Sequence, residues 1–362
     1  ARGQEGLENA YKCHYPTKAP ASGRLTKRSA LHDRLADAGA CFTDVSGWEG
    51  PAWFASEGGS AEVGELGWGR MHWFKNWEAE HRACREAVAL FDMSFMANFL
   101  VQGRDAGAAL DYISGNNVNG STGQITYTQW LNDQGGLEAD VTVIKIEDDK
   151  LMVVVSDTMH VHALTWLRRN IAPTAHAFVT DVTSGLTQIN VQGPNSRALM
   201  QELTSADLSN DAFPFRAAMD IDIGFARALC VRITYVGELG YELYVPCEQA
   251  VQVYDQLVAA GQKHGLKHAG LQTLGSLRLE KAYRDYGHDL DNTDNAFQTG
   301  LGFAVRLDKP SGILGQAKAM EQKAAAPYHT RLVQVLVSDP EPMLWHGEVI
   351  YHNDKPVGDV RS

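Results

Sequence analysis

Strand-like runs that alternate with single helix-like runs are the feature that most constrains how this chain can fold. Runs rich in β-branched and aromatic residues predict strands, and apolar residues three or four positions apart predict helices. In chain order we expect a helix over 77–90, a strand over 95–101, a helix over 103–113, strands over 124–131, 137–146 and 151–155, a helix over 159–171, strands over 178–182 and 187–191, and helices over 193–203, 248–264 and 269–286. Because single helices interrupt the strands in two successive sets, we predict an α+β fold of ferredoxin-like units.

Two glycines predict a hairpin within the second set. Gly237 and Gly240 lie between strand-like runs at 228–235 and 241–245, so we expect the backbone to turn there. The hairpin would present Tyr235 at one end and Glu242 at the start of the return strand. A carboxylate in that place can accept two parallel N–H donors from a flat heterocycle. An exposed glutamate on an ordinary hairpin is the alternative that the spacing leaves open.

Asp140 interrupts the apolar pattern of the strand predicted over 137–146. Because aspartate is disfavoured in strands, Asp140 either faces solvent or has a functional role. Tyr127 and Gln129 lie on the strand before it. Cross-strand neighbours face each other in a sheet, so we expect one of these two side chains to share a wall with Asp140.

Arg278 follows the apolar stripe of the last predicted helix. Arg278 and Lys281 are three residues apart, so on a helix they would form a small basic patch. Glu280 and Arg284 are four residues apart, and we expect an ion pair within the helix. An arginine beside a core face usually has a partner. For Arg278 the partner is either a ligand carboxylate or a neighbouring Asp or Glu.

Composition excludes several functional classes. The chain has 362 residues, which predicts two or three domains, and a formal net charge of −12, which argues against broad nucleic-acid binding. No apolar run approaches the roughly 18 residues that a membrane-spanning helix needs. The sequence has no Gly-x-Gly-x-x-Gly after a strand, so we expect no dinucleotide-binding fold within these residues.

Cysteine and histidine spacing predicts neither a metal site nor a disulfide framework. The five cysteines are far apart without a Cys-x-x-Cys pair, and the 13 histidines have no metal-ligand spacing. Reduced thiols fit a bacterial cytoplasm or a mitochondrial matrix.

Both ends of the chain differ from its middle. Residues 1–60 look irregular apart from a helix near 29–38, yet they carry Trp48, Trp53 and Phe54, an apolar load that must be buried against something. From about residue 330 short strands are expected over 332–337, 348–352 and 357–360. Two or three strands cannot form a stable barrel alone. We therefore expect this β-rich domain to be truncated here.

Three motifs occur in order: Gly135-Gly136 followed by Asp140, Tyr235 through Glu242, and Ser276 through Glu280. The combination resembles the folate-binding aminomethyltransferase module, the T-protein of glycine cleavage. It resembles more closely the C-terminal half of the dimethylglycine/sarcosine dehydrogenase family. Further similar stretches are residues 82–94, 127–132, 300–305 and 339–342, and residues 31–55 resemble the linker between the flavin and folate halves of these enzymes.

The resemblance implies a cloverleaf of α+β domains around a folate channel, followed by a C-terminal β-barrel domain. It divides the chain into a linker at 1–60, a folate-binding part at 61–328 and the start of the barrel domain at 329–362. By resemblance, Glu242 holds the amino and ring N–H groups of the pterin, with Tyr235 and Tyr127 near the ring. Asp140 then lies beside the reacting nitrogens, and Arg278 meets the folate tail.

The implied function is tetrahydrofolate-dependent one-carbon transfer in an FAD-dependent dehydrogenase or oxidase that demethylates a small N-methyl amine and forms 5,10-methylenetetrahydrofolate. FAD is expected only in a flavin half that these residues do not contain, in the same polypeptide or another subunit. Two alternatives remain open at this point. One is a stand-alone folate-dependent methyl- or aminomethyltransferase, and the other is a non-catalytic regulatory subunit of the same fold.

Overall fold

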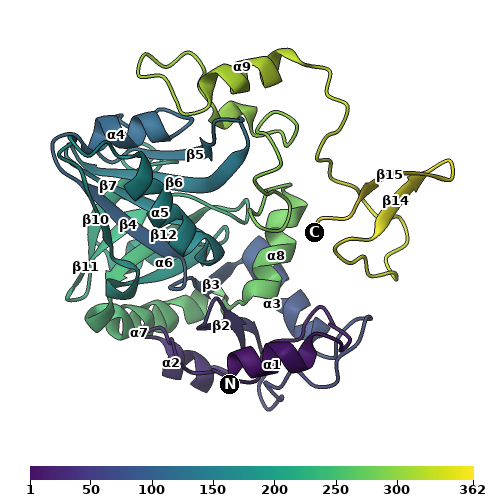
Figure 1. Cartoon of the computed structure of the whole chain (residues 1–362). Coiled ribbons are helices and arrows are strands. Elements are labelled where there is room, and N and C mark those ends of the chain that lie inside the picture. Colours follow the sequence, from purple (N-terminus) through teal and green to yellow (C-terminus); the bar gives the residue numbers. More distant parts are fainter.

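Two β-sheets form the centre of the molecule. The computed structural model describes residues 1–362, and helices lie on the outer side of each sheet (Figure 1). The inner faces of the two sheets meet at a small apolar cluster. Ile125, Ile144 and Met152 of one sheet pack there against Val231 and Tyr244 of the other. The space between the sheets is therefore partly filled by apolar side chains and partly lined by polar ones.

The first sheet has five antiparallel strands in the order β5-β6-β7-β4-β8. Their bounds are β4 Ala97–Gln102, β5 Ile125–Leu131, β6 Leu137–Glu147, β7 Lys150–Val155 and β8 Phe178–Asp181. Helices α4 (Ala106–Ile113) and α5 (His160–Asn170) cover its outer face. Without β5, the spatial order β6-β7-β4-β8 is that of a ferredoxin-like unit. The predicted α+β class is confirmed.

The second sheet has six strands in the order β10-β11-β12-β9-β3-β13, and only the β3–β13 pair is parallel. Their bounds are β3 Val88–Asp92, β9 Leu186–Gln192, β10 Ala218–Ile223, β11 Ala226–Val231, β12 Gly240–Pro246 and β13 Leu266–His268. Helices α6 (Ser196–Leu203) and α7 (Ala250–Gly261) cover its outer face and share its core.

The two sheets repeat one design, and the repeat is visible in the sequence. The sequence Val-Gln-Gly occurs at the end of β4 and again at the end of β9, with Gly103 and Gly193 directly after the strands, and a helix follows in both cases. The two glycines have φ of +128° and +133°, a region that favours glycine. A Cβ at Gly103 would lie 2.2 Å from the His176 carbonyl oxygen, and one at Gly193 would lie 2.4 Å from that of Ala87. Glycine is therefore required at both strand-to-helix turns.

The N-terminal segment packs onto the second sheet. It contains α1 (Arg2–Asn9), α2 (His32–Asp37) and the hairpin of β1 (Ala40–Val45) and β2 (Trp48–Phe54), followed by α3 (Phe74–Glu86). Trp53 and Phe54 are buried, and Trp53 stacks on Trp73 with ring centroids 5.7 Å apart. The apolar load of this segment is thus buried within the chain itself.

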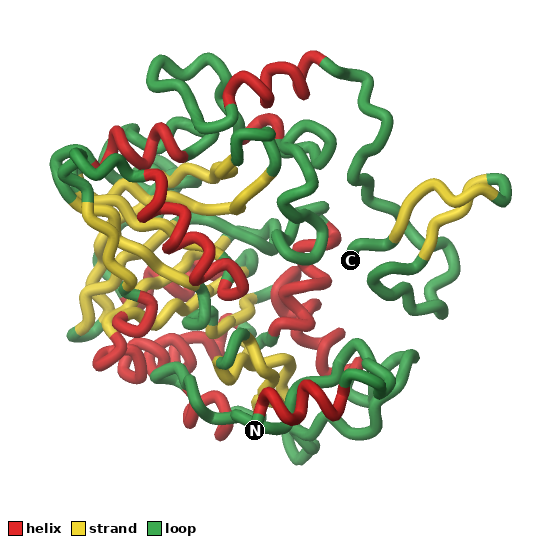
Figure 2. Tube along the Cα trace, in the orientation of Figure 1, coloured by secondary structure: helices red, strands yellow, loops and turns green.

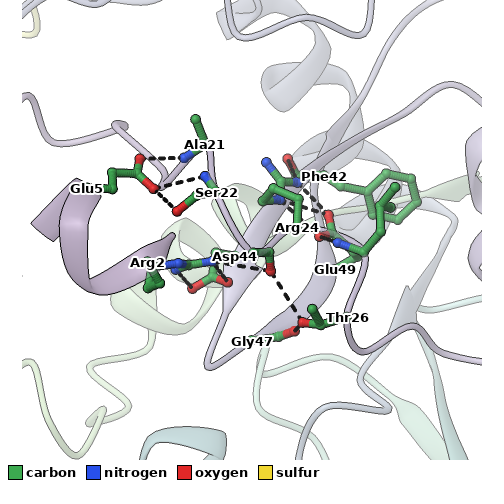
Figure 3. A network of polar contacts seen from close by, with 12 residues as sticks. Arg2, Glu5, Ala21, Ser22, Arg24, Thr26, Phe42, Asp44, Gly47 and Glu49 are labelled. Atoms are coloured by element: carbon green, nitrogen blue, oxygen red, sulfur yellow. Dashed lines mark hydrogen bonds and ion pairs between the residues drawn. The ribbon is translucent and has the colours of Figure 1, made fainter.

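Polar contacts fasten the first 26 residues to this hairpin (Figure 3). Arg2 pairs with Asp44, and Glu5 accepts hydrogen bonds from the backbone of Ala21 and Ser22. Arg24 pairs with the buried carboxylate of Glu49.

A third part lies beside the two sheets and is mostly loop (Figure 2). It follows α8 (Leu271–Glu280) and contains α9 (Gln316–Ala324); its core includes Leu131 and Leu137 of the first sheet with Tyr286 and Leu301. Residues 329–362 contain one hairpin, β14 (Val349–His352) and β15 (Lys355–Asp359), which projects from the body (Figure 1). The division into three parts at residues 60/61 and 328/329 stays a prediction.

Several predicted elements are wrong. The helix expected over 77–90 ends at Glu86, and Val88–Asp92 is strand β3, buried in the middle of a sheet. A short apolar run fits a buried strand as well as a helix, so periodicity could not separate them. Residues 332–337 form no strand. Strands β1, β2, β10 and β13 were not predicted.

The segments around the central hairpin also differ from the prediction. The first strand ends at Val231, so residues 232–239 form a loop in place of a tight turn. Helix α8 ends at Glu280, and Arg284 instead donates to the Thr299 carbonyl oxygen. The predicted Glu280–Arg284 ion pair is therefore wrong. No helix of the chain combines the length and the apolar character needed to cross a membrane.

Candidate functional site

Asp140 lies on β6 and points toward the second sheet. Its neighbours Val141 and Val143 pack on the outer core, while Ile144 packs between the sheets, so Asp140 shares the inner face with Ile144. The Tyr127 hydroxyl donates to its carboxylate at 2.7 Å, and the Gln129 amide donates at 3.3 Å. The predicted shared wall is confirmed. Both of the neighbouring side chains that we considered contact Asp140.

The surroundings of Asp140 tune its protonation. Burial raises the pKa of Asp140 to about 7, although the hydrogen bonds from Tyr127 and Gln129 lower it. A carboxyl with that pKa is about half ionised at neutral pH, which suits a group that accepts and returns a proton.

Glu242 lies on the facing sheet in similar surroundings. It is directly opposite Asn190 of β9, whose amide donates to it at 3.2 Å, and the Tyr244 hydroxyl donates at 2.8 Å. Burial raises the pKa of Glu242 to about 7, while these two donors lower it. The exposed-glutamate alternative is therefore wrong. Glu242 is a partly buried carboxylate on the inner face of its sheet.

Four amide side chains on the inner faces leave a carbonyl oxygen without a protein partner. They are Asn98 on β4, Gln129 on β5, and Gln188 and Gln192 on β9, all buried. Buried polar groups are nearly always hydrogen-bonded, so four such acceptors in one region need an explanation. The four oxygens are covered by protein atoms, whereas the carboxylates of Asp140 and Glu242 are only partly buried. The inner faces are therefore rich in hydrogen-bond acceptors, and the two carboxylates suit a ligand that presents N–H donors.

Aromatic side chains border this region. Tyr235 lies in the loop after β11, and its hydroxyl donates to the Arg284 carbonyl oxygen at 2.7 Å. Burial raises the pKa of Tyr235, and the charges of Asp285 and Asp140 raise it further. The Tyr127 ring stacks near Phe303, with centroids 6.1 Å apart, and Phe303 is 70% exposed. These rings offer flat faces beside Asp140.

Arg278 has a carboxylate partner from its own chain. Its guanidinium is buried, pairs with Asp289 and donates to the Tyr283 carbonyl oxygen and the Ser362 hydroxyl. The alternative of a neighbouring Asp is thus the one that the structure contains. Arg278 is buried whereas Lys281 is exposed, so the two residues do not form the predicted basic patch.

The five predicted residues form two groups. Asp140 raises the pKa of both Tyr127 and Tyr235, and Arg278 lowers the pKa of Tyr235. Glu242 makes no hydrogen bond to any of the other four. Sequence reasoning missed Asn190, Gln188 and Gln192. The strict alternation of polar and apolar residues in 188–192 is the signal that marks them as one face of a strand.

No group of three or more His, Cys, Asp or Glu in the chain is arranged to hold a metal ion.

Comparison with known proteins identifies the family. The model of the GCVT N-terminal domain family matches residues 31–309. The chain belongs to this family. The predicted resemblance to the aminomethyltransferase module and to the dimethylglycine/sarcosine dehydrogenases is therefore confirmed.

Two curated relatives match this GCVT-family chain over nearly all of its length. A 4-methylaminobutanoate oxidase (formaldehyde-forming) of Paenarthrobacter nicotinovorans is 39% identical and covers 100% of the chain. The mitochondrial sarcosine dehydrogenase of Homo sapiens is 33% identical and covers 99% of the chain. The chain spans only 44% and 43% of these two relatives.

Among solved structures, the glycine cleavage system aminomethyltransferase T of Bartonella henselae has the same fold, with a TM-score of 0.75. It covers 93% of the chain, the chain covers 85% of it, and the identity is 21%.

Proposed function

We propose that this GCVT-family chain binds tetrahydrofolate between its two sheets and serves one-carbon transfer. The observation that carries the proposal is the pair of partly buried carboxylates, Asp140 and Glu242, on inner sheet faces that are rich in hydrogen-bond acceptors. A reduced pterin is a flat ring with amino and ring N–H donors, so it complements side chains that accept hydrogen bonds, and not cationic side chains. The residues present therefore fit this cofactor.

Glu242 serves as the anchor of the pterin. Asn190 and Tyr244 fix the carboxylate, and its desolvated surroundings strengthen any hydrogen bond that it accepts from a bound ring. Binding two N–H donors favours the ionised form, which burial alone disfavours. Tyr235 and Tyr127 supply aromatic surface next to the same space.

Asp140 serves the chemistry. Tetrahydrofolate supplies the nitrogens that take up a one-carbon unit, and a proton must leave as each new C–N bond forms. Asp140 accepts that proton, since its pKa of about 7 leaves it partly ionised at neutral pH. The Tyr127 hydroxyl orients the carboxylate and stabilises its charge.

We further infer that the one-carbon unit comes from a small N-methyl amine oxidised in an FAD-containing half outside this chain. The names of the two relatives, a formaldehyde-forming 4-methylaminobutanoate oxidase and a sarcosine dehydrogenase, support the oxidation of an N-methyl amine. Capture of the released carbon by tetrahydrofolate would give 5,10-methylenetetrahydrofolate, the expected product. Arg278 approaches the folate tail in this proposal. A tail carboxylate would share the guanidinium with Asp289.

Glu242→Gln tests the proposal by calorimetry with tetrahydrofolate. The amide offers a donor where an acceptor is needed, and hydrogen bonds to charged groups contribute about 1.5–3 kcal/mol, so affinity should fall at least about tenfold. Glu248→Gln, on an exposed glutamate six residues further on, is the matched control and should bind like the wild type. Equal affinity in the wild type and Glu242→Gln contradicts the assignment of Glu242.

A further inference from the structure

Arg85 of α3 has a partner for every one of its N–H donors. An arginine has five such donors in a fixed planar fork. Nε and Nη2 donate to the Glu280 carboxylate at 3.1 and 2.8 Å, and Nη2 also donates to the Leu277 carbonyl oxygen at 3.0 Å. Nη1 donates to the Val236 carbonyl oxygen and, at 3.0 Å, to the Glu238 carboxylate. The side chain is only 18% exposed.

The two carbonyls that Arg85 holds adjoin two of the proposed folate contacts. Val236 directly follows Tyr235 in the loop between β11 and β12, and Leu277 directly precedes Arg278 on α8. These segments are about 40 residues apart in sequence, yet one guanidinium fixes both. Val236 and Leu277 are also buried in one apolar cluster beneath it, so neither segment can move without disturbing the other.

We propose that Arg85 is a positioning residue that sets the placement of Tyr235 relative to Arg278. This inference rests on the proposed folate site. The planar fork is what the role requires, because its hydrogen bonds leave in fixed directions toward two backbone segments. Glu238 and Glu280 hold the fork in its plane from either side. A lysine offers a point charge and fewer directions, so it reproduces the arrangement only in part.

A cavity next to Arg85 makes the role accessible to experiment. It has a volume of about 400 Å³ and is lined by Phe74, Trp77, His81, Arg82, Arg85 and Ser276, among others. A small guanidinium compound can therefore reach the place that the side chain leaves when it is truncated.

The experiment compares Arg85→Ala with Arg82→Ala. Arg82 lies on the same helix and lines the same cavity, but its charge partners are Glu78 and Glu86 of its own helix, at 3.5 and 3.7 Å. Affinity for tetrahydrofolate and for a reduced pterin without a tail is measured by calorimetry at a temperature where both variants are folded. We expect the affinity of Arg85→Ala for tetrahydrofolate to fall at least about tenfold, and its affinity for the tail-less pterin to fall less. Arg85→Lys should lose less affinity than Arg85→Ala. The affinity of Arg82→Ala should stay within about twofold of the wild type. Methylguanidinium should restore part of the affinity of Arg85→Ala alone.

Hydrogen exchange of the ligand-free chain separates this inference from the proposed function. Arg85→Ala should raise exchange in both 232–239 and 271–280, and Arg82→Ala in neither. Unchanged exchange in these segments, or wild-type folate affinity of Arg85→Ala without rescue, overturns the role of Arg85. A wild type that does not bind tetrahydrofolate at all overturns the proposed function, while the exchange result still decides whether Arg85 couples the two segments.

Discussion

Asp140 and Glu242 lie on different sheets but in closely matched surroundings. Each is a desolvated carboxylate that accepts one tyrosine hydroxyl, at 2.7 and 2.8 Å, and one amide N–H, at 3.3 and 3.2 Å. Burial raises the pKa of both to about 7. In each pair the amide comes from the residue directly opposite on the neighbouring strand.

The difference between them lies in what surrounds the pair. The charges of Asp285 and Arg284 also act on Asp140, whereas only two fixed hydrogen-bond donors act on Glu242. Asp140 thus lies near other charged groups, whereas only Tyr244 and Asn190 act on Glu242. In the proposed function the same local design therefore serves two tasks, proton transfer at Asp140 and fixed hydrogen bonding at Glu242.

Asp140→Asn should have the largest effect and should separate the roles of the two carboxylates. Asparagine keeps the volume but has no basicity, so we expect one-carbon transfer to slow by about 10²–10⁴, the usual effect of a lost general base. Folate affinity should stay within a few-fold. The measurement is methylenetetrahydrofolate formation by the complete enzyme, with amine oxidation followed separately as the control. Transfer at the wild-type rate would make Asp140 a structural aspartate.

The pH dependence of binding should separate the two carboxylates. A bound ring that donates to Glu242 needs its ionised form, so affinity should rise as pH increases toward about 7 and level off above it, by up to about tenfold per pH unit. Calorimetry in two buffers of different ionisation enthalpy should detect proton release on binding near pH 6. Asp140→Asn should retain this slope and Glu242→Gln should lose it. The reverse result assigns the anchor to Asp140.

The Asp140 site could be predicted from the sequence more fully than the Glu242 site, for a topological reason. Asp140 and Gln129 are 11 residues apart on consecutive strands, so one hairpin brings them together. Glu242 and Asn190 are 52 residues apart and meet only because β12 pairs with β9 after two intervening strands. Local patterning carries no information about such a pairing. Asn190, the long-range partner of Glu242, therefore became visible only in the fold.

The same distinction explains the fold predictions. Both repeat units were predicted from strands and helices that alternate locally, and they are present. The first three residues of β3, 88–90, were assigned to a helix because the partners of β3, strands β9 and β13, lie about 100 and 180 residues later. Arg278 shows the limit for a single residue. Its neighbourhood on the helix suggested an ion pair, but not that Asp289 would come from the turn after α8.

The free energy of unfolding should show the smallest effect, and it should change in the same direction when either carboxylate is replaced. Each has a folded-state pKa of about 7, against ordinary values of 3.8 for Asp140 and 4.5 for Glu242. A raised pKa means that the contribution to stability is complete below the ordinary value and is lost as pH rises through about 7. Asp140→Asn and Glu242→Gln remove the charge that is costly to bury. Each should therefore raise the free energy of unfolding at pH 8 by about 1 kcal/mol, or roughly 2 °C in Tm.

Thermal denaturation at pH 3.5 is the control for this effect, since both carboxyls are mostly protonated there in the folded and in the unfolded chain and the gain should disappear. A loss of stability in both variants at pH 8 would mean that the two carboxylates hold the sheets together. A gain limited to pH 8 would mean that the chain keeps two destabilising charges between its sheets for the sake of function.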